Sequence, residues 1–291
     1  MKKSATKYAP KNAKKFTSYY EPDGEKLVTL VNYILDKSGS MQSVKSQVLS
    51  GFEEYINGLK SKMDNESRLL FSLTLFDSNG SIRLDKPYLV TPIQDVNPLN
   101  NSTYVTGGQT PLYDAIGKTI AEVDNTIKVR GLKIHRILTV IHTDGQENDS
   151  REFDSSAINR LREEKEKTGH WTFVYIGASP TTWADASKLG FNKLNTMAYD
   201  PLQTKGMFTV AANATMNYRA SNDTSSRAFF SGGSKFIGTQ EVKFKKRNEH
   251  LSSDGYTRYT ATEWRDGTWS CNCPGWAFKK SCKHIGGGVS A

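Results

Sequence analysis

The chain has 291 residues, of which 36% are hydrophobic and 11% aromatic, so it is long and apolar enough for one large domain and a second, small one. No run of eighteen apolar residues is present, which excludes a membrane-spanning helix and argues against a membrane partner. The lysine-rich start lacks the apolar segment of a secretory signal, and we therefore expect a cytoplasmic, intracellular protein.

The net positive charge of the chain, +9 in all, comes from its two ends. Residues 1–20 hold six lysines and no acidic residue, and residues 225–291 hold eleven Lys and Arg against five Asp and Glu. Basic ends on a slightly acidic body suit an acidic partner such as DNA or RNA. A solvated tail that only aids solubility explains the first twenty residues equally well.

After this lysine-rich arm the chain alternates between strand-like and helix-like segments. Leu27–Leu35 is almost continuously apolar, as a buried strand is, and Ser43–Lys62 repeats apolar residues at helical spacing. Leu69–Phe76 is a second apolar strand. An Asn-Gly turn signal follows, after which Ser81–Leu84 is expected to pair back as a hairpin.

The alternation continues to about residue 220. Helices are expected at Leu112–Ile127, Asp154–Thr168, Thr181–Leu189 and Pro201–Tyr218. Strands are expected at Ile134–Ile141, Trp171–Ile176 and, more weakly, Leu194–Met197. This order predicts an α/β fold with a doubly wound, mostly parallel central sheet that is covered by helices on both faces.

The composition divides the chain into four regions. We expect a flexible basic arm over 1–24, the α/β domain over 25–222, a Ser- and Gly-rich linker over 223–238 and a small C-terminal domain over 239–291. Short strands are expected in the last region, at Val242–Phe244, Tyr256–Glu263 and Thr268–Ser270.

Oxygen-bearing side chains follow three segments of the predicted sheet domain. Asp36, Ser38 and Ser40 come directly after the first strand, Thr110 stands in TGGQTPLYDAI at the start of a helix, and Asp144 follows the strand that ends in IHTDG. Binding sites of doubly wound sheets collect at the carboxyl ends of the strands. Carboxylates and hydroxyls suit a hard cation, and the sequence therefore predicts a site for Mg²⁺, or Mn²⁺, built from these five residues.

The D-x-S-x-S, T-P-L-Y-D-A and T-D-G segments together resemble the von Willebrand factor A domain, a Rossmann-like α/β family with a metal-ion-dependent adhesion site. The resemblance covers roughly residues 25–222. It implies that Ser38, Ser40 and Thr110 approach the ion through hydroxyls, and that Asp36 and Asp144 bind it directly or through water. Thr106 competes with Thr110 for the threonine role, but Thr110-Pro111 matches the family pattern better. The resemblance also implies an open coordination position that an Asp or Glu of a partner protein fills.

Two other readings of these residues remain open. Asp36 and Ser40 are good helix caps, and Asp144-Gly145 is a good turn. A metal-dependent phosphodiester hydrolase would need a base, for which Glu147, Asp149 and Asp77 are the nearest candidates, but no motif assigns them. We assign no role to the two strand histidines, His135 and His142, and expect no catalytic residue.

The three cysteines of the chain lie close together near its end, in CNCPGWAFKKSCKH. Cys271, Cys273, Cys282 and His284 make a complete tetrahedral Zn²⁺ set with no open position, which indicates a structural site. The C-x-C…C-x-H spacing resembles the SWIM zinc finger, over roughly residues 240–288. The resemblance implies that a β-hairpin supplies the first pair of ligands and the start of a helix the second.

Basic residues surround this cysteine cluster. They are Lys243, Lys245, Lys246, Arg247, Arg258, Arg265, Lys279, Lys280 and Lys283. Tryptophans stand between them, and cations that contact phosphates beside aromatics that stack on bases are typical of nucleic-acid binding. The alternative is that Trp269 and Trp276 form the small core while the basic side chains are only solvated.

The sequence as a whole favours a non-enzymatic intracellular adaptor. Its first domain would bind an exposed Asp or Glu of a partner protein through Mg²⁺, and its zinc finger would bind nucleic acid or a second protein. The rival hypotheses are a sequence-independent nucleic-acid-binding protein and a metal-dependent hydrolase.

Overall fold

The structure, a computed structural model, describes residues 27–61, 67–144, 146–178, 181–199, 204–221, 223–230, 246–251, 258–263 and 269–271. The chain divides into two compact units, Met1–Gly233 and Ser234–Ala291. Within the described ranges, no helix is long and apolar enough to cross a bilayer.

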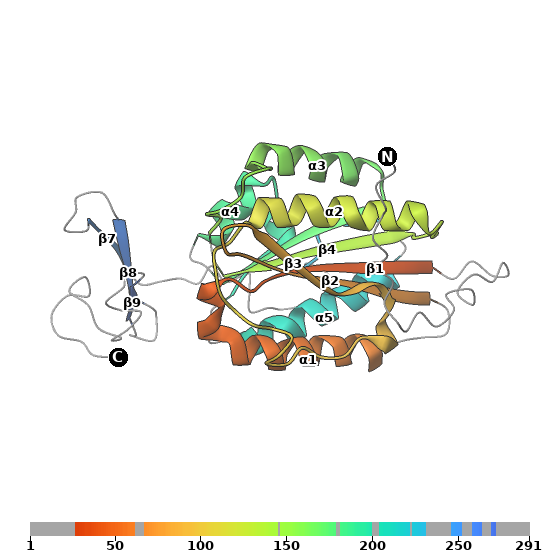
Figure 1. Cartoon of the computed structure of the whole chain (residues 1–291), viewed down its shortest axis with the longest axis horizontal. Coiled ribbons are helices and arrows are strands. Elements are labelled where there is room, and N and C mark those ends of the chain that lie inside the picture. Colours follow the sequence, from red (N-terminus) through yellow and green to blue (C-terminus); the bar gives the residue numbers. More distant parts are fainter. Residues whose placement is uncertain are drawn as a thin grey trace, which may run out of the picture. The chain divides into compact units, whose positions relative to one another are not determined.

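The first unit is built around a six-stranded sheet in the order β3-β2-β1-β4-β5-β6 (Figure 1). Its strands are β1 (Leu27–Asp36), β2 (Ser67–Ser78), β3 (Ile82–Pro92), β4 (Arg136–Thr143), β5 (Trp171–Gly177) and β6 (Thr196–Ala198). Every neighbouring pair is parallel except β2 with β3. The predicted mostly parallel central sheet is confirmed.

Helices cover both faces of this sheet. They are α1 (Lys45–Ser61), α2 (Leu112–Val129), α3 (Ser155–Lys167), α4 (Thr182–Lys188) and α5 (Thr204–Ala220). Figure 1 shows α1 and α5 on one face and α2 and α3 on the other. The positions of the helices agree with the apolar spacing of the sequence, within a few residues at the ends.

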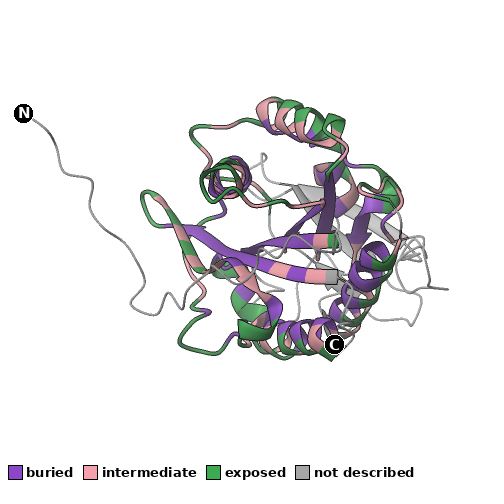
Figure 2. Cartoon of the chain, turned by 90° about the vertical axis from the view of Figure 1, so that its right-hand side faces the viewer, coloured by how far each residue is buried: buried purple, intermediate pink, exposed green. Residues whose placement is uncertain are grey.

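The alternation of side chains along β1 explains why two cores form. Val31 and Tyr33 point to the face covered by α1 and α5, whereas Leu30 and Ile34 belong to the core under α2. All four side chains are fully buried, and the strands appear as a buried layer between helices in Figure 2. A strand buried on both faces reads as a continuous apolar run, which is the pattern of this segment.

The helices α1 and α5 pack closely because α1 carries glycine where the two meet. A Cβ atom added at Gly51 would lie 2.1 Å from the ring of Phe208, which is buried on α5. A residue larger than glycine at this position would force the helices apart.

The edge strand β3 is longer than the sequence indicates. Only Ser81–Leu84 was expected to pair back on β2, whereas the strand runs from Ile82 to Pro92. The chain after Leu84 reads Asp-Lys-Pro, which is typical of a turn, but an edge strand tolerates proline because one of its sides makes no ladder hydrogen bonds.

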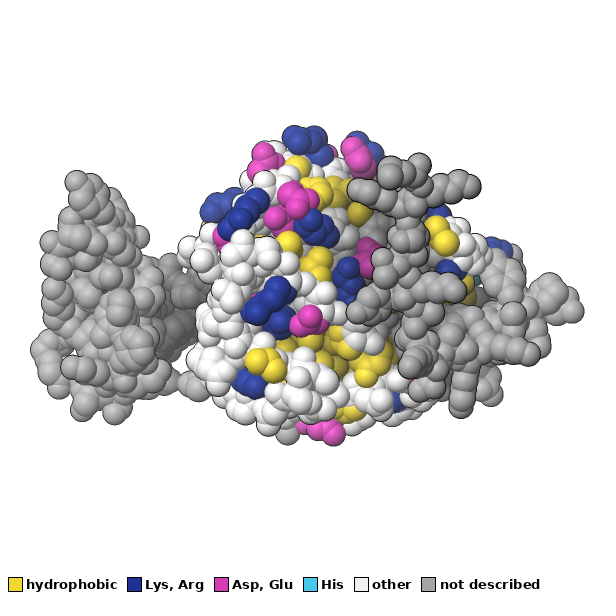
Figure 3. Space-filling model, in the orientation of Figure 1, with side chains coloured by type: hydrophobic (Ala, Val, Ile, Leu, Met, Phe, Trp, Pro, Cys, Tyr) yellow, Lys and Arg dark blue, Asp and Glu magenta, His cyan; other side chains and the backbone are white. Residues whose placement is uncertain are grey.

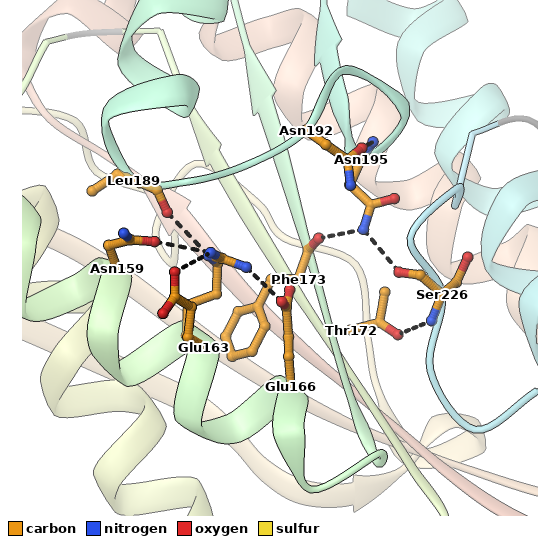
Figure 4. Close-up of polar contacts among 10 residues, drawn as sticks. Asn159, Glu163, Glu166, Thr172, Phe173, Leu189, Asn192, Asn195 and Ser226 are labelled. Carbon is orange, nitrogen blue, oxygen red and sulfur yellow. Dashed lines mark hydrogen bonds and ion pairs between the residues drawn. The ribbon is translucent and has the colours of Figure 1, made fainter.

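Residues 223–230, here called the C-terminal strap, lie against the sheet although the sequence assigns them to a linker. Ser226 N donates to Thr172 Oγ1 at 2.8 Å, and Asn195 Nδ2 donates to the carbonyls of Phe173 and Ser226 (Figure 4). Phe229 N donates in turn to Asn195 Oδ1, and the Phe229 side chain is buried. The folded part of the first unit therefore extends to residue 230.

The second unit contains a three-stranded antiparallel sheet in the order β7-β8-β9. Its strands are β7 (Lys246–Leu251), β8 (Arg258–Glu263) and β9 (Trp269–Cys271). The last two of these strands, both expected from the sequence, pair antiparallel with Glu263 opposite Trp269. The strand expected at Val242–Phe244 lies outside the described residues, and β7 was not expected.

Candidate metal centre

Asp36 is the last residue of β1, and its side chain is fully buried. Its Oδ1 accepts a hydrogen bond from Ser38 N at 2.6 Å, and its Oδ2 accepts one from Thr143 Oγ1 at 2.6 Å. Burial raises the pKa of Asp36 to about 7, because loss of water disfavours the charged carboxylate more than the hydrogen bonds from Thr143 and Ser38 favour it. The negative charge of Asp144 raises this pKa further.

A second carboxylate lies beside the first because β1 and β4 are neighbours in the sheet. Ser40 Oγ donates to Asp144 Oδ1 at 2.7 Å, and the hydroxyls of Ser38 and Ser40 lie 3.2 Å apart. Burial raises the pKa of Asp144, and the hydrogen bond from Ser40 opposes this increase. Four predicted site residues, Asp36, Ser38, Ser40 and Asp144, thus belong to one hydrogen-bonded group.

Thr110 approaches this group through the backbone of its loop. Gly39 N donates to the carbonyl of Gly108 at 3.0 Å, and Gly107 N donates to the carbonyl of Lys37 at 2.9 Å. The loop needs glycine at residue 108 for two reasons. Gly108 has a φ of 72°, and a Cβ added there would lie 1.9 Å from the carbonyl oxygen of Ser78. The side chain of Thr110 is buried, but among the described residues it makes no hydrogen bond to the other four predicted ligands.

The competing threonine, Thr106, is engaged elsewhere. Its hydroxyl donates to Oε1 of Gln42, which lies in the short helix η2 (Gly39–Val44). The sequence pattern favoured Thr110 over Thr106 for the threonine role, and the contact with Gln42 gives Thr106 another partner.

No positive side chain among the described residues neutralises Asp36 or Asp144. The nearest lysine along the chain, Lys37, is buried and pairs instead with Asp77 at 3.3 Å and Asp85 at 2.9 Å. Asp77 is buried as well and accepts a hydrogen bond from Arg83 Nε at 2.7 Å. A fully buried carboxylate and a half-buried one beside it, without a cation, are electrostatically incomplete.

The donors fit a hard divalent cation on chemical grounds. Two carboxylates, the hydroxyls of Ser38 and Ser40 and the nearby Thr143 present oxygen atoms only, which Mg²⁺ and Mn²⁺ prefer. In the described part of the chain no group of three or more His, Cys, Asp or Glu side chains could hold a metal. Hydroxyls and water would therefore have to complete the coordination here.

The loop after Asp144 has a structural role that the sequence did not reveal. Helix α2 has no side-chain cap of its own at Pro111. Instead Glu147 accepts a hydrogen bond from Tyr113 N at 3.0 Å, and Ser150 Oγ accepts from the same N–H and from Asp114 N. Asn148 Oδ1 accepts from Thr110 N at 2.8 Å, so this loop also fixes the threonine loop.

The carboxylates considered as catalytic bases are engaged in such structural contacts. Glu147 accepts three further hydrogen bonds from its own loop, from Asp149 N, Ser150 N and Ser150 Oγ. Asp149 Oδ2 accepts from Ser78 Oγ at 2.5 Å, and Asp77 is paired with Lys37 and Arg83. Each of the three carboxylates already has hydrogen-bond donors or ion-pair partners.

His142 is a core residue, as expected for a strand histidine. It is fully buried, Nδ1 lies 3.2 Å from the hydroxyl of Tyr33, and Nε2 lies 2.8 Å from the hydroxyl of Tyr199. Burial lowers the pKa of His142 to about 3, so the imidazole is neutral at physiological pH.

The predicted zinc ligands lie almost entirely outside the described residues. Cys271 is the last residue of β9, for which the structure describes the backbone, and Cys273, Cys282 and His284 follow it. Of the predicted nucleic-acid-binding residues, Lys246 and Arg247 are in β7 and Arg258 is in β8. The others, Lys243, Lys245, Arg265, Lys279, Lys280 and Lys283, are outside the described ranges.

Comparison with known proteins gives only distant structural similarities. No protein-family model matches the sequence. No curated protein matches it either.

Several solved structures align with part of this chain at low similarity. Proximal thread matrix protein 1 from the mussel byssus is 13% identical with a TM-score of 0.45, and 64% of this chain aligns with 45% of that one. The manganese-loaded TRAP protein of Plasmodium vivax is 15% identical with a TM-score of 0.42, over 62% of this chain and 72% of that one. The vWF domain of the type V pilus tip protein Mfa5 from Porphyromonas gingivalis is 9% identical with a TM-score of 0.43, over 67% and 97%. The chain thus spans about half the length of the mussel protein.

Proposed function

We propose that the first unit is a von Willebrand factor A-type domain that binds a partner protein through a divalent cation, Mg²⁺ or Mn²⁺. Asp36, Ser38, Ser40, Thr110 and Asp144 would hold the cation. The observation that carries this proposal is the hydrogen-bonded group of Asp36, Ser38, Ser40 and Asp144, which has no positive partner among the described residues.

The role of each residue follows from its surroundings. Asp36 is held by hydrogen bonds from Thr143 and from Ser38 N, so its carboxylate is fixed before any cation arrives. Ser40 connects the loop after β1 to Asp144 at the end of β4. A bound cation would supply a positive centre that a carboxylate of the partner can neutralise.

The contacts of the neighbouring carboxylates favour binding over hydrolysis. A hydrolase needs a free base beside the metal, whereas Glu147, Asp149 and Asp77 are used to fix loops and ion pairs. We therefore propose no catalytic residue, and incubation of phosphodiester substrates with the protein and Mg²⁺ or Mn²⁺ should give no hydrolysis above the Asp36→Ala background.

For the second unit we propose a structural Zn²⁺ site at Cys271, Cys273, Cys282 and His284, and contact of its basic residues with nucleic acid or a second protein. The proposal rests on the spacing of these four residues and on the antiparallel β8–β9 pair that leads to the first of them. On the face of the first unit seen in Figure 3, basic and acidic side chains are interspersed, and no continuous basic surface appears there. This face therefore gives no reason to extend the proposed nucleic-acid contact to the first unit.

Metal content and salt dependence test the second unit. Cys273→Ser should lower bound zinc from one equivalent toward none without changing the unfolding transition of the first unit. Titration with labelled DNA and RNA at several salt concentrations should show an affinity that falls steeply with salt, and a flat response would refute phosphate contact.

A pull-down from lysate tests the adaptor role, which we place in the cytoplasm of the cell. Full-length protein in Mg²⁺ should capture a partner that is lost in EDTA and on Asp36→Ala. Asp95 has an exposed carboxylate in the short helix η3 (Ile93–Asp95) and provides the matched control. Asp95→Ala should leave capture of the partner unchanged. Capture that survives both EDTA and Asp36→Ala refutes the metal-dependent interaction.

A further inference from the structure

The loops around the candidate metal centre form a surface with an unusual composition. Three loops contribute to it, residues 38–43, 105–110 and 146–148, here called the site loops. They are joined directly, because Gly39 N donates to the carbonyl of Gly108 and Asn148 N donates to that of Thr110. Exposed side chains of the site loops therefore surround the group formed by Asp36, Ser40 and Asp144.

Four of the exposed side chains on the site loops are carboxamides: Gln42, Gln109, Gln146 and Asn148. Each keeps hydrogen-bonding capacity after its contacts within the chain. Asn148 and Gln42 use their oxygens to accept from Thr110 N and from the Thr106 hydroxyl, so their amino groups remain available. Gln146 donates to Thr181 and keeps its oxygen, and Gln109 bonds the end of β2 through its backbone, which leaves its amide side chain available.

The site loops contain no lysine or arginine. Their one carboxylate is Glu147, which accepts hydrogen bonds from the backbone of α2 and of its own loop. Of the cations that flank the site loops, Lys37 is buried and pairs with Asp77 and Asp85, Arg151 pairs with Asp149, and Lys45, the first residue of α1, is half-buried. Val105 adds an apolar side chain that is 58% exposed.

The charges around the candidate metal centre limit which ligands can bind there. Asp36 and Asp144 would hold one divalent cation, and one carboxylate of a ligand would neutralise the positive charge that the cation presents. A second carboxylate or a phosphate beside it would find no cation on the site loops and would be repelled by the acidic groups. Carboxamides, by contrast, offer both a donor and an acceptor, which matches the N–H and C=O groups of an extended peptide backbone.

We propose, on the basis of the proposed function, that the partner segment is an extended peptide with a single carboxylate among uncharged residues. The carboxamides of the site loops bind its main chain, and Val105 contacts an apolar side chain next to the acidic one. Clusters of acidic residues and phosphates are rejected at this surface.

A peptide selection measures this preference for a single carboxylate directly. Full-length protein is used to select linear peptides from a library of randomised heptapeptides, in parallel with Mg²⁺ and with EDTA. Peptides enriched only with Mg²⁺ should carry one Asp or Glu with uncharged flanks. Enrichment of peptides with two or more acidic residues overturns the proposal, and so does the absence of Mg²⁺-dependent enrichment.

Charge variants provide the second test. Gln109→Lys should shift the enriched set toward peptides with two acidic residues and strengthen their binding about fivefold, as a new exposed ion pair can. Gln94→Lys, the same change on η3, should leave the set unchanged. Equal effects of the two variants overturn the assignment of Gln109.

The same samples separate the two levels of the proposal. Binding of Mn²⁺, followed by its electron paramagnetic resonance signal, is measured on wild type and on both lysine variants. If Mn²⁺ binds and polyacidic peptides are enriched, the peptide preference is wrong and the metal site stands. If Mn²⁺ does not bind, the proposed function itself fails.

Discussion

Ser40 Oγ donates a 2.7 Å hydrogen bond to Asp144 Oδ1, although the two residues are 104 positions apart in the sequence. The contact joins the loop after β1 to the residue that follows β4, and these two strands are neighbours in the parallel sheet. The fully buried Asp36 and the half-buried Asp144 thereby share one site with no positive side chain, among the described residues, to neutralise them. Each expectation below follows from this arrangement or from the packing that supports it.

Removal of the buried charge at Asp36 should change how stability depends on pH. Folding raises the pKa of this group from 3.8 to about 7, so the native state holds the proton more tightly than the unfolded chain does. In EDTA its contribution to the free energy of unfolding should therefore fall as pH rises from about 4 to about 7, by up to about 4 kcal/mol. Asp36→Asn should abolish this decline.

Urea unfolding of wild type and Asp36→Asn at several pH values measures this effect. The difference between the two proteins isolates the group from all other titrating residues. Parallel pH profiles for wild type and Asp36→Asn would contradict a raised pKa. Saturating Mg²⁺ should remove most of the wild-type decline, because a bound cation favours the charged carboxylate.

Asp77 should matter for stability more than the exposed acid beside it. Asp77 is buried and forms ion pairs with both Lys37 and Arg83, whereas Asp85 is exposed and pairs with Lys37. Asp77→Asn leaves a buried lysine with one weaker partner, and we expect a loss of about 3 kcal/mol. Asp85→Asn should cost less than about 1 kcal/mol, as exposed ion pairs do. Chemical denaturation of the two variants measures their free energies of unfolding. Equal losses for Asp77→Asn and Asp85→Asn would show that the ion pairs are not organised around Asp77.

Two glycines of α1 offer a matched test of the α1–α5 contact. A Cβ at Gly51 would lie 2.1 Å from the Phe208 ring, whereas one at Gly58 would lie 3.5 Å from Ala212 Cβ, an ordinary contact. Gly51→Ala should destabilise the protein by about 1–3 kcal/mol through overpacking. Gly58→Ala should be neutral or stabilise it by up to about 1 kcal/mol, since alanine favours helix. Thermal unfolding of both variants decides, and a neutral Gly51→Ala would contradict the close packing of the two helices.

The sheet and the convergence of Asp36, Ser38, Ser40 and Asp144 could be predicted from the sequence because they depend on local patterns. The apolar run that ends at Asp36 and the one that ends before Asp144 mark parallel strands, and parallel strands bring their carboxyl ends to one edge. The contacts of Thr143 and Asn148 could not be predicted in this way. Their roles depend on how distant loops meet, and no spacing along the chain encodes that.

The contacts of the C-terminal strap could not be predicted for a similar reason. The C-terminal strap is rich in Ser and other polar residues, as a linker is, and Phe229 is its only buried residue. Its attachment comes from Asn195, whose side chain bonds Phe173, Ser226 and Phe229. These are tertiary contacts of one amide, and composition does not report them.

The most direct test of the metal centre is the binding of Mn²⁺ to the full-length protein, followed by electron paramagnetic resonance. Wild type should bind one Mn²⁺ per chain more than the double variant Asp36→Asn, Asp144→Asn, with circular dichroism confirming that both are folded. Mg²⁺ should displace this ion. Equal Mn²⁺ binding by the two folded proteins would contradict a cation site at the ends of β1 and β4.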